Sequence, residues 1–448
     1  MRIFMDRTEN SVFYRRLAYL ALPIMIQDFL NSFVNLLDTF MVGSLGIEEI
    51  TAVGLSNQLF FLFNIIGFGV ASGSSILMGQ FWGGGDKKSV HKTMGVCLTG
   101  CLTAALLISG VAFFYPRGVM RFFSADERVI EIGATYLKIV WVSYILAAVS
   151  MTINISLKST GQTLMPMATS IAALVTNLAA TYLFLFVFKK GIAGVAAATV
   201  VARAVELCLQ LILINAARSP IVGKLKNYLA ADAAFLKKYA VLVAPVIMNE
   251  FMWSLGTTVC TAAYRYCGTD AQGALQISNT VNSMFLSVGM AVGSACAIIL
   301  SNTLGAGEPE RAIKYSRKLF AISGVTSVLS GALMIVSFPL VAPFFGVSDA
   351  VNAYAQKIIL VLSVVLVFKN LNFTAIVGIL RSGGDTFFCF LVDMSSVWVA
   401  GVPMAFLGAA ALGLPVYWVV AMASAEEFFK LFISGGRVLS NVWAKKLI

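Results

Sequence analysis

The stretch AQGALQISNTVNSMFLSVGMAVGSACAIILSNTLGAG, residues 271–307, decides the fold class. It contains no charged side chain, and it is longer than the roughly 20 apolar residues that a helix needs to cross a bilayer. The whole chain has the same character, because 59% of its 448 residues are hydrophobic and 12% are charged. Soluble domains carry roughly 25% charged residues. The composition therefore excludes a soluble enzyme and indicates a polytopic membrane protein.

The length of the uncharged runs distinguishes helices from a barrel. A transmembrane β-barrel has alternating segments of about ten residues, whereas the run at 93–116 is uncharged throughout. The sequence therefore predicts an all-α fold. Twelve transmembrane helices are expected, near residues 15–40, 50–82, 93–115, 130–157, 163–188, 192–216, 239–264, 270–303, 319–345, 354–380, 386–410 and 413–436.

The stretch 271–307 also repeats an earlier part of the chain. Adding 222 to the residue numbers from 46 to 85 gives these identical pairs: Gly46/Gly268, Ala52/Ala274, Ser56/Ser278, Asn57/Asn279, Phe63/Phe285, Gly67/Gly289, Val70/Val292, Ser72/Ser294, Ile76/Ile298, Gly83/Gly305 and Gly85/Gly307. We therefore expect two pseudo-symmetric bundles of six helices, residues 1–217 and 239–448, joined by a cytoplasmic linker at 218–238. Parallel repeats of this kind suit alternating access, so transport is the predicted functional class.

The positions of the basic residues predict the topology. With the N-terminus inside, Lys and Arg in the loops favour the cytoplasmic side by about three to one. Both termini are therefore expected in the cytoplasm, Arg381 in a cytoplasmic loop, and His91 in a solvated loop. The Lys and Arg residues behind the net charge of +11 lie between the apolar runs and not on one polar face, so no nucleic-acid partner is indicated. The seven scattered cysteines and the single histidine indicate neither a disulfide framework nor a metal site.

Polar residues inside the first predicted helix share one face. Within an arc of about 100° at helical spacing lie Gln27, Asp28, Asn31, Asn35 and Asp38. An ionisable group at the bilayer centre costs about 2.5–3.5 kcal/mol, so this stripe should face a wet cavity or polar partners. It is interpreted as a cation or proton site. The alternative is that the acids cap or hydrogen-bond a neighbouring helix.

The seventh predicted helix repeats this arrangement. Glu250 shares a face with Trp253 and Thr257, and Asn249 precedes it. A buried carboxylate in such a place can exchange a proton, or it can coordinate Na⁺ with the neighbouring amide and hydroxyls. The alternative is a permanently protonated, hydrogen-bonded Glu250.

Further charges lie inside the spans. Three pairs have helical spacing and are predicted to form local ion pairs, namely Arg203 with Glu206, Glu427 with Lys430, and Glu426 with Lys430. Asp393 and Lys369 have no such partner on their own helices. A role in coupling or substrate contact and a purely structural role both stay open for these two residues.

The chain resembles the multidrug and toxic compound extrusion (MATE) transporters. The resemblance lies in Leu22-Pro23, the segment from Val34 to Gly43, the glycines of 83–85 and 305–307, Pro245 with Asn249-Glu250, the segment from Gly191 to Thr199, and the segment from Arg381 to Thr386. It implies two six-helix bundles around a V-shaped central cavity. It also implies export of cationic or amphiphilic compounds in exchange for Na⁺ or H⁺.

The resemblance carries roles to single residues. It implies that Asp38, Asn177 and Thr199 are cation ligands of the first bundle, and that Glu250 is the helix-seven acid of the second. The family usually has an acid four residues after the helix-five asparagine, where this chain has Thr181. Asp28 and Asp393 are expected to supply the missing charge.

The expected function is therefore a cation-coupled exporter of organic cations or amphiphiles, in the bacterial plasma (inner) membrane among its lipids. It is expected to act as a monomer and to need no cofactor besides the transported Na⁺ or H⁺. A flippase of a lipid-linked precursor, an intramembrane transferase and a passive channel are the alternatives. The predicted substrate-cavity residues are Gln27, Asn31, Asn35, Asn249, Trp253, Thr257, Asn279 and Asn282.

Overall fold

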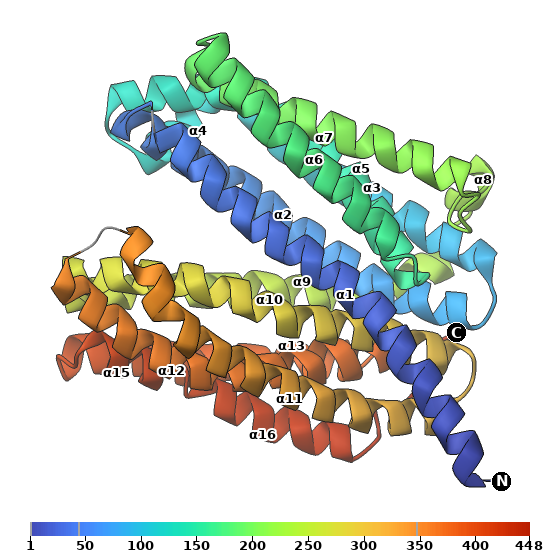
Figure 1. Ribbon diagram of the computed structural model, residues 1–448. Helices are drawn as coiled ribbons and strands as arrows, with labels where there is room; N and C mark the ends of the chain where they lie inside the picture. Colours follow the sequence, from blue (N-terminus) through green and yellow to red (C-terminus); the bar gives the residue numbers. More distant parts are fainter. Residues whose placement is uncertain (1, 44, 346–347) are drawn as a thin grey trace. The chain divides into compact units, whose positions relative to one another are not determined.

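The computed structural model describes residues 2–43, 45–345 and 348–448, without the side chains of residues 2–9, 33–40, 43, 269 and 344. All elements of this part of the chain are helical (Figure 1). The helices of the first half are α1 (Arg2–Gly43), α2 (Ile47–Gly83), α3 (Lys87–Phe114), α4 (Pro116–Phe123), α5 (Glu127–Ser159), α6 (Leu164–Tyr182), η1 (Leu183–Val187), α7 (Gly191–Ala216) and α8 (Leu225–Tyr228).

The helices of the second half include several short π and 3₁₀ turns, labelled η. They are α9 (Ala233–Ala263), η2 (Tyr264–Cys267), α10 (Thr269–Gly305), α11 (Pro309–Val341), η3 (Ala342–Phe345), α12 (Asp349–Phe373), η4 (Thr374–Leu380), η5 (Arg381–Gly383), α13 (Thr386–Ser395), η6 (Ser396–Gly401), α14 (Val402–Phe406), η7 (Leu407–Ala411), α15 (Val416–Ala423) and α16 (Glu426–Leu439).

The described residues contain ten helices that are long and apolar enough to cross a membrane. They correspond to the second to eleventh predicted spans, and α1 covers the first. The last predicted span, 413–436, is divided into α15 and α16. The backbone tightens between them, because the Ala425 N–H donates to the Met422 carbonyl and the Glu427 N–H donates to the Ser424 carbonyl. The predicted all-α, multi-pass membrane fold is confirmed.

The backbone forms two compact units. We name residues 1–29, 83–85 and 248–448 the C-terminal unit, and residues 30–82 and 86–247 the N-terminal unit. The chain passes between the units inside α1, on either side of residues 83–85 and inside α9. Helix α1 contains Pro23, and α9 contains Pro245. The division at 217 and 239, which the repeat predicts, stays a prediction.

In the N-terminal unit, the first part of α9 packs closely on α2. A Cβ atom added at Gly69 would lie 2.8 Å from Cα of Ile247, and one added at Gly73 would lie 2.8 Å from Cγ1 of Val243. Small residues spaced by four allow helix backbones to approach in a membrane. The Gly69-x-x-x-Gly73 pattern therefore explains this contact.

The C-terminal unit contains a related helix pair. Leu20 and Ile24 of α1 belong to one buried hydrophobic cluster with Ala291 and Ala295 of α10. These two alanines are 222 residues beyond Gly69 and Gly73, which is the offset of the internal repeat. Small residues at equivalent positions of α2 and α10 therefore lie where a second helix packs, α9 in the N-terminal unit and α1 in the C-terminal unit.

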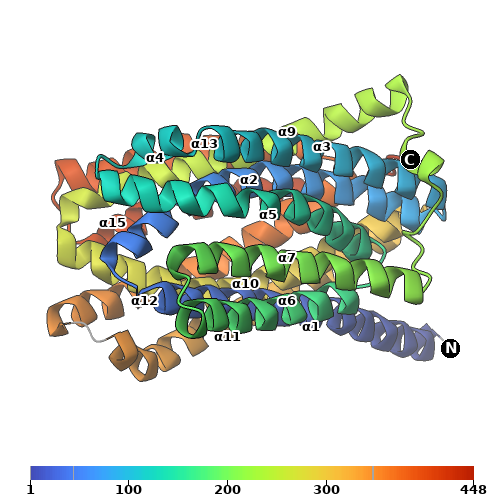
Figure 2. The ribbon, with the colours of Figure 1, turned by 90° about the horizontal axis from the view of Figure 1, so that it is seen from above.

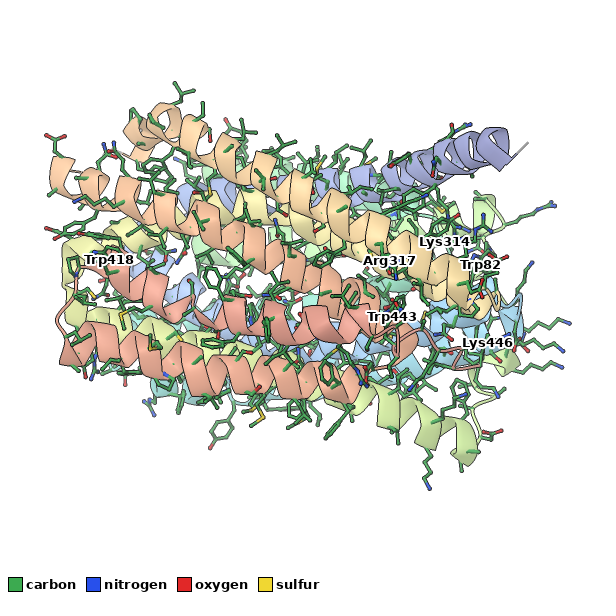
Figure 3. The ribbon with its side chains drawn as sticks, turned by 90° about the horizontal axis from the view of Figure 1, so that it is seen from below. Trp82, Lys314, Arg317, Trp418, Trp443 and Lys446 are labelled. Atoms are coloured by element: carbon green, nitrogen blue, oxygen red, sulfur yellow. The ribbon has the colours of Figure 1, made fainter. Side chains whose placement is uncertain are left out.

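Both chain termini lie at the same end of the C-terminal unit (Figures 1 and 2). At this end lie the buried Trp443 and the basic residues Lys314, Arg317 and Lys446, whereas Trp418 lies at the opposite end (Figure 3). Basic side chains therefore gather at the end of this unit that carries both termini.

Candidate functional site

The first feature of the candidate site is an ion pair inside the C-terminal unit. Nη1 of Arg381, on η5, lies 2.9 Å from Oε1 of Glu250, on α9. The side chains are 2% and 16% exposed, respectively. A buried charge without a partner is very costly, so each residue compensates the other. The carboxylate of Glu250 therefore lies beside the permanent positive charge of the Arg381 guanidinium.

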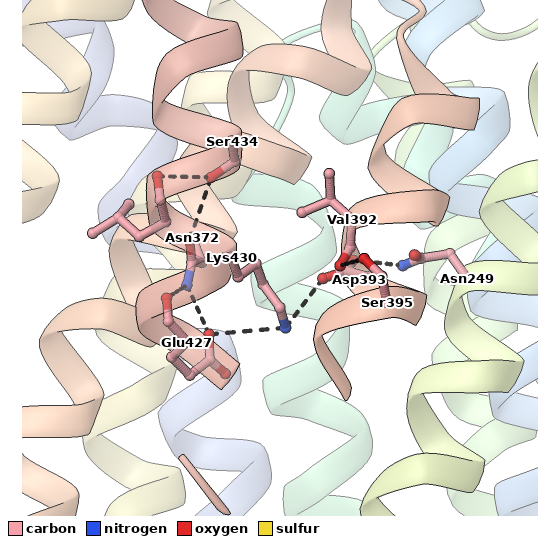
Figure 4. A network of polar contacts seen from close by, with 9 residues as sticks. Asn249, Asn372, Val392, Asp393, Ser395, Glu427, Lys430 and Ser434 are labelled. Carbon is pink, nitrogen blue, oxygen red and sulfur yellow. Dashed lines mark hydrogen bonds and ion pairs between the residues drawn. The ribbon is translucent and has the colours of Figure 1, made fainter. Parts of the chain in front are cut away.

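A second network joins α9, α12, α13 and α16 (Figure 4). Nδ2 of Asn249 donates to Oδ2 of Asp393 at 2.9 Å, and the other oxygen, Oδ1, lies 3.1 Å from Nζ of Lys430. The same ammonium lies 3.8 Å from Oε2 of Glu427. This carboxylate oxygen also accepts a hydrogen bond from Nδ2 of Asn372 at 2.8 Å. Lys430 therefore links two acids from different helices.

Local departures from regular helix geometry position these charges. The π turn η4 continues α12 into η5, which carries Arg381, and the π turn η6 begins three residues after Asp393. π turns are rare in proteins as a whole, and those that occur often lie at functional sites. Glu426 and Glu427 occupy the first turn of α16, where the helix dipole and the free N–H groups favour negative charge.

The N-terminal unit contains a smaller polar network. Nη1 of Arg203 lies 2.9 Å from Oε2 of Glu206, which confirms the predicted local pair on α7. The Ser170 hydroxyl of α6 donates to the other oxygen of this carboxylate at 3.5 Å. One turn further along α7, Gln210 donates to Asn154 of α5 at 3.0 Å. These contacts connect three helices through buried polar groups.

The predicted cation ligands of this unit lie on neighbouring helices. Asn177 is partly buried on α6, and Thr199 is partly buried on α7, where its hydroxyl donates to a backbone carbonyl one turn earlier. Thr181, four residues beyond Asn177, is buried. The side chains of Asn35 and Asp38 lie outside the described residues. Their assignment as cation ligands stays a prediction.

The other predicted residues differ in burial. Gln27 and Asn282 are buried, Asp28, Asn31 and Thr257 are partly buried, and Trp253 and Asn279 are exposed. The Thr257 hydroxyl donates to the backbone of Ser254 at 2.9 Å. A common cavity lined by this set stays a prediction. Of the predicted site residues, the structure brings together Asn249 and Asp393, and it places Glu250 beside Arg381.

Arg381 was expected in a cytoplasmic loop, but it begins the helical turn η5 and its side chain is 2% exposed, so the expected loop position was wrong. The turn that carries it packs against the C-terminal segment, because Gly383 touches the backbone of Trp443 more closely than a Cβ atom would allow. With Glu250 as its partner, the guanidinium is stable in this buried position. The signal in the sequence was an acid inside a predicted span without a basic residue at helical spacing, because such an acid needs a cation from another segment.

The predicted exposure of His91 was also wrong. His91 belongs to α3 and is 6% exposed, with Nε2 2.9 Å from the carbonyl oxygen of Pro220. Its ring lies 5.3 Å from that of Tyr228 on α8. The segment between α7 and α9 therefore covers this end of α3 and removes the imidazole from water.

The predicted pair of Glu426 and Lys430 is not formed. Lys430 reaches Asp393 and Glu427 instead, and Oε2 of Glu426 has no hydrogen-bond partner within the described residues. The competing partner, Asp393, comes from another helix, which spacing along α16 does not reveal. The i, i+3 pair of Glu427 and Lys430 is confirmed at 3.8 Å.

The MatE family model matches residues 23–183 and 245–407 of this chain. The chain belongs to the MatE family. The two MatE matches begin 222 residues apart, at the offset of the internal repeat. The predicted resemblance to MATE transporters is therefore confirmed, and each half of the sequence contributes one match.

Two MatE relatives come from Bacillus subtilis. The uncharacterized transporter YisQ is 24% identical, and the match covers 95% of this chain and 94% of YisQ. The probable multidrug resistance protein YoeA is also 24% identical, and the match covers 97% of this chain and 95% of YoeA. A crystal structure of a variant of the Vibrio cholerae MATE transporter VcmN has a TM-score of 0.87 at 17% identity, over 98% of this chain and 99% of VcmN. This likeness confirms the predicted MATE-like fold.

Proposed function

We propose that this protein is a secondary active antiporter that exports cationic or amphiphilic organic molecules in exchange for Na⁺ or H⁺. The observation that carries the proposal is the placement of charged networks inside the apolar helices of a MatE chain. Ionisable residues at membrane depth are costly and mark ion or proton pathways. The name of its relative YoeA, a probable multidrug resistance protein, supports the substrate class.

The proposed mechanism is alternating access. The driving ion must bind one conformation better than the other, because a ligand with equal affinity for both shifts no population. We assign ion binding to Asp38 with Asn177 and Thr199, and substrate binding to the Phe- and Met-rich helices. The protein would act as a monomer in a bacterial plasma membrane with both termini in the cytoplasm. The basic residues at the end that carries both termini support this orientation.

The proposal is tested by efflux of ethidium from proteoliposomes that contain the full-length protein and an imposed Na⁺ or pH gradient. One of the two gradients should accelerate efflux, and Asp38→Asn should abolish this acceleration. Asp270→Asn is the matched control, because Asp270 is an exposed acid in the first turn of α10. Efflux that responds to neither gradient would refute antiport and direct attention to lipid-linked substrates.

A further inference from the structure

Lys430 is a cation built into the interior of the C-terminal unit. Its side chain is 4% exposed, and its ammonium lies 3.1 Å from Asp393 and 3.8 Å from Glu427 (Figure 4). Lysine is almost never fully buried unless it is paired. The two carboxylates come from α13 and α16, so the ammonium lies at the place where two helices direct negative charge toward each other.

Three of the four carboxylate oxygens of Asp393 and Glu427 already have a donor or a cationic partner. Asp393 receives the ammonium of Lys430 on one oxygen and the amide of Asn249 on the other. Oε2 of Glu427 receives a hydrogen bond from Asn372 in addition to the charge of Lys430. A metal ion at this position would have to displace an ammonium that is covalently attached to the chain.

Two further oxygens beside the pair have no hydrogen-bond partner within the described residues. They are Oδ1 of Asn249 and Oε2 of Glu426, whose residues are 4% and 9% exposed. The amide of Asn249 donates to Asp393, and Glu426 lies four residues before Lys430 on α16. Two buried acceptor oxygens next to the network are therefore left without a donor among the described residues. Oxygen-rich surroundings of this kind suit a hard cation once the ammonium is removed.

We propose that Lys430 determines the ion selectivity of the C-terminal unit, because its ammonium takes the place of Na⁺ between Asp393 and Glu427. This unit then binds no Na⁺, since a second cation at short distance would be repelled in the low-dielectric interior. Arg381 neutralises Glu250 in the same way. The inference rests on the proposed cation-coupled export, and it leaves any driving Na⁺ to the site proposed at Asp38.

The test is the thermal stability of the purified full-length protein in detergent, measured in NaCl and in choline chloride at equal ionic strength. A ligand that binds only the folded state raises Tm in proportion to the logarithm of its concentration. Lys430→Ala should gain a Na⁺-dependent rise in Tm that exceeds the response of the wild type to Na⁺ by several degrees. This additional rise should disappear in Lys430→Ala/Asp393→Asn, and Lys430→Arg, the matched control that keeps the charge, should respond to Na⁺ no more than the wild type does.

A Lys430→Ala protein that folds but gains no response to Na⁺ would overturn the proposal. If Lys430→Ala does not fold, the proposal is tested by measuring the binding of radioactive ²²Na⁺ to the Asp38→Asn protein. This variant lacks the proposed Na⁺ ligand outside the network, so any remaining binding would report on the C-terminal unit. No saturable binding is expected. Saturable binding that is lost on adding Asp393→Asn would overturn the proposal. Neither measurement involves transport, so a failure of gradient-driven efflux is distinguishable from a failure of this inference.

Discussion

Arg381 and Glu250 are separated by 131 residues in the sequence, and their charged groups meet at 2.9 Å inside the C-terminal unit. Arg381 is the first residue of η5, which follows α12 and η4, and Glu250 lies in the middle of α9. The pair therefore connects two membrane-spanning segments by a charge-assisted contact. It also means that the acid predicted to bind the coupling ion has a permanent cation as its neighbour.

Removal of one member of this pair should destabilise the protein strongly. Arg381→Gln leaves Glu250 without its partner, and breaking a buried ion pair costs about 3–5 kcal/mol of unfolding free energy. The double variant Arg381→Gln/Glu250→Gln should recover most of this loss, because no uncompensated charge remains. Denaturation in mixed micelles measures both values. A double variant that is as unstable as the single one would show that packing, and not charge, determines the cost.

The contact of α9 with α2 should depend on glycine. Gly69→Ala places a Cβ atom 2.8 Å from Cα of Ile247, so the two backbones must separate. Overpacking of this kind costs about 1–3 kcal/mol. Gly110→Ala in α3 is the matched control, since a Cβ atom there meets nothing within 4 Å. Equal Tm values for the two variants would contradict the close approach of the helices.

Much of the fold could be predicted because a bilayer imposes simple demands on sequence. Each span must satisfy its own backbone and present apolar side chains, so hydropathy located the helices. The pairs Arg203 with Glu206 and Glu427 with Lys430 were also predictable, because their helical spacing makes them neighbours. These features depend only on residues that are close in sequence.

The rest of the site depends on contacts between distant segments. Arg381 is followed by Ser-Gly-Gly, a composition that is equally typical of a solvated loop. Its burial depends on Glu250 and on Trp443, which hydropathy does not connect to it. The link from Asp393 to Lys430 likewise joins two helices. The individual charges could be predicted to need partners, but the identity of each partner could not.

The start of α3 should show a pH-dependent stability. Burial raises the pKa of Asp86, but hydrogen bonds from the hydroxyl and backbone N–H of Ser89 lower this pKa by more, so it lies below its ordinary value. The cap therefore stabilises the helix above the unfolded pKa of about 3.9, and the contribution is lost as the pH falls through the folded pKa.

Asp86→Ala tests this cap. At pH 7 the variant should lose about 1 kcal/mol, the usual value of an N-cap. The difference from the wild type should shrink below about pH 4, where the carboxylate becomes protonated. Asp86→Asn keeps an acceptor oxygen and should show little loss at either pH. Thermal unfolding across this pH range measures the effect, and a difference that grows on acidification would contradict the assigned sign.

The C-terminal segment should be essential for the stability of the C-terminal unit. Trp443 is fully buried, its indole N–H donates to the carbonyl of Val438 at 3.2 Å, and its backbone packs on Gly383, two residues from Arg381. Trp443→Ala should therefore cost about 3–5 kcal/mol, as truncations of buried tryptophans do. Trp418→Ala, at the opposite end and 56% exposed, should change stability by less than about 0.5 kcal/mol. Chemical denaturation of both variants measures the contrast. Equal losses would mean that the segment from Asn441 to Ile448 does not secure the turn that carries Arg381.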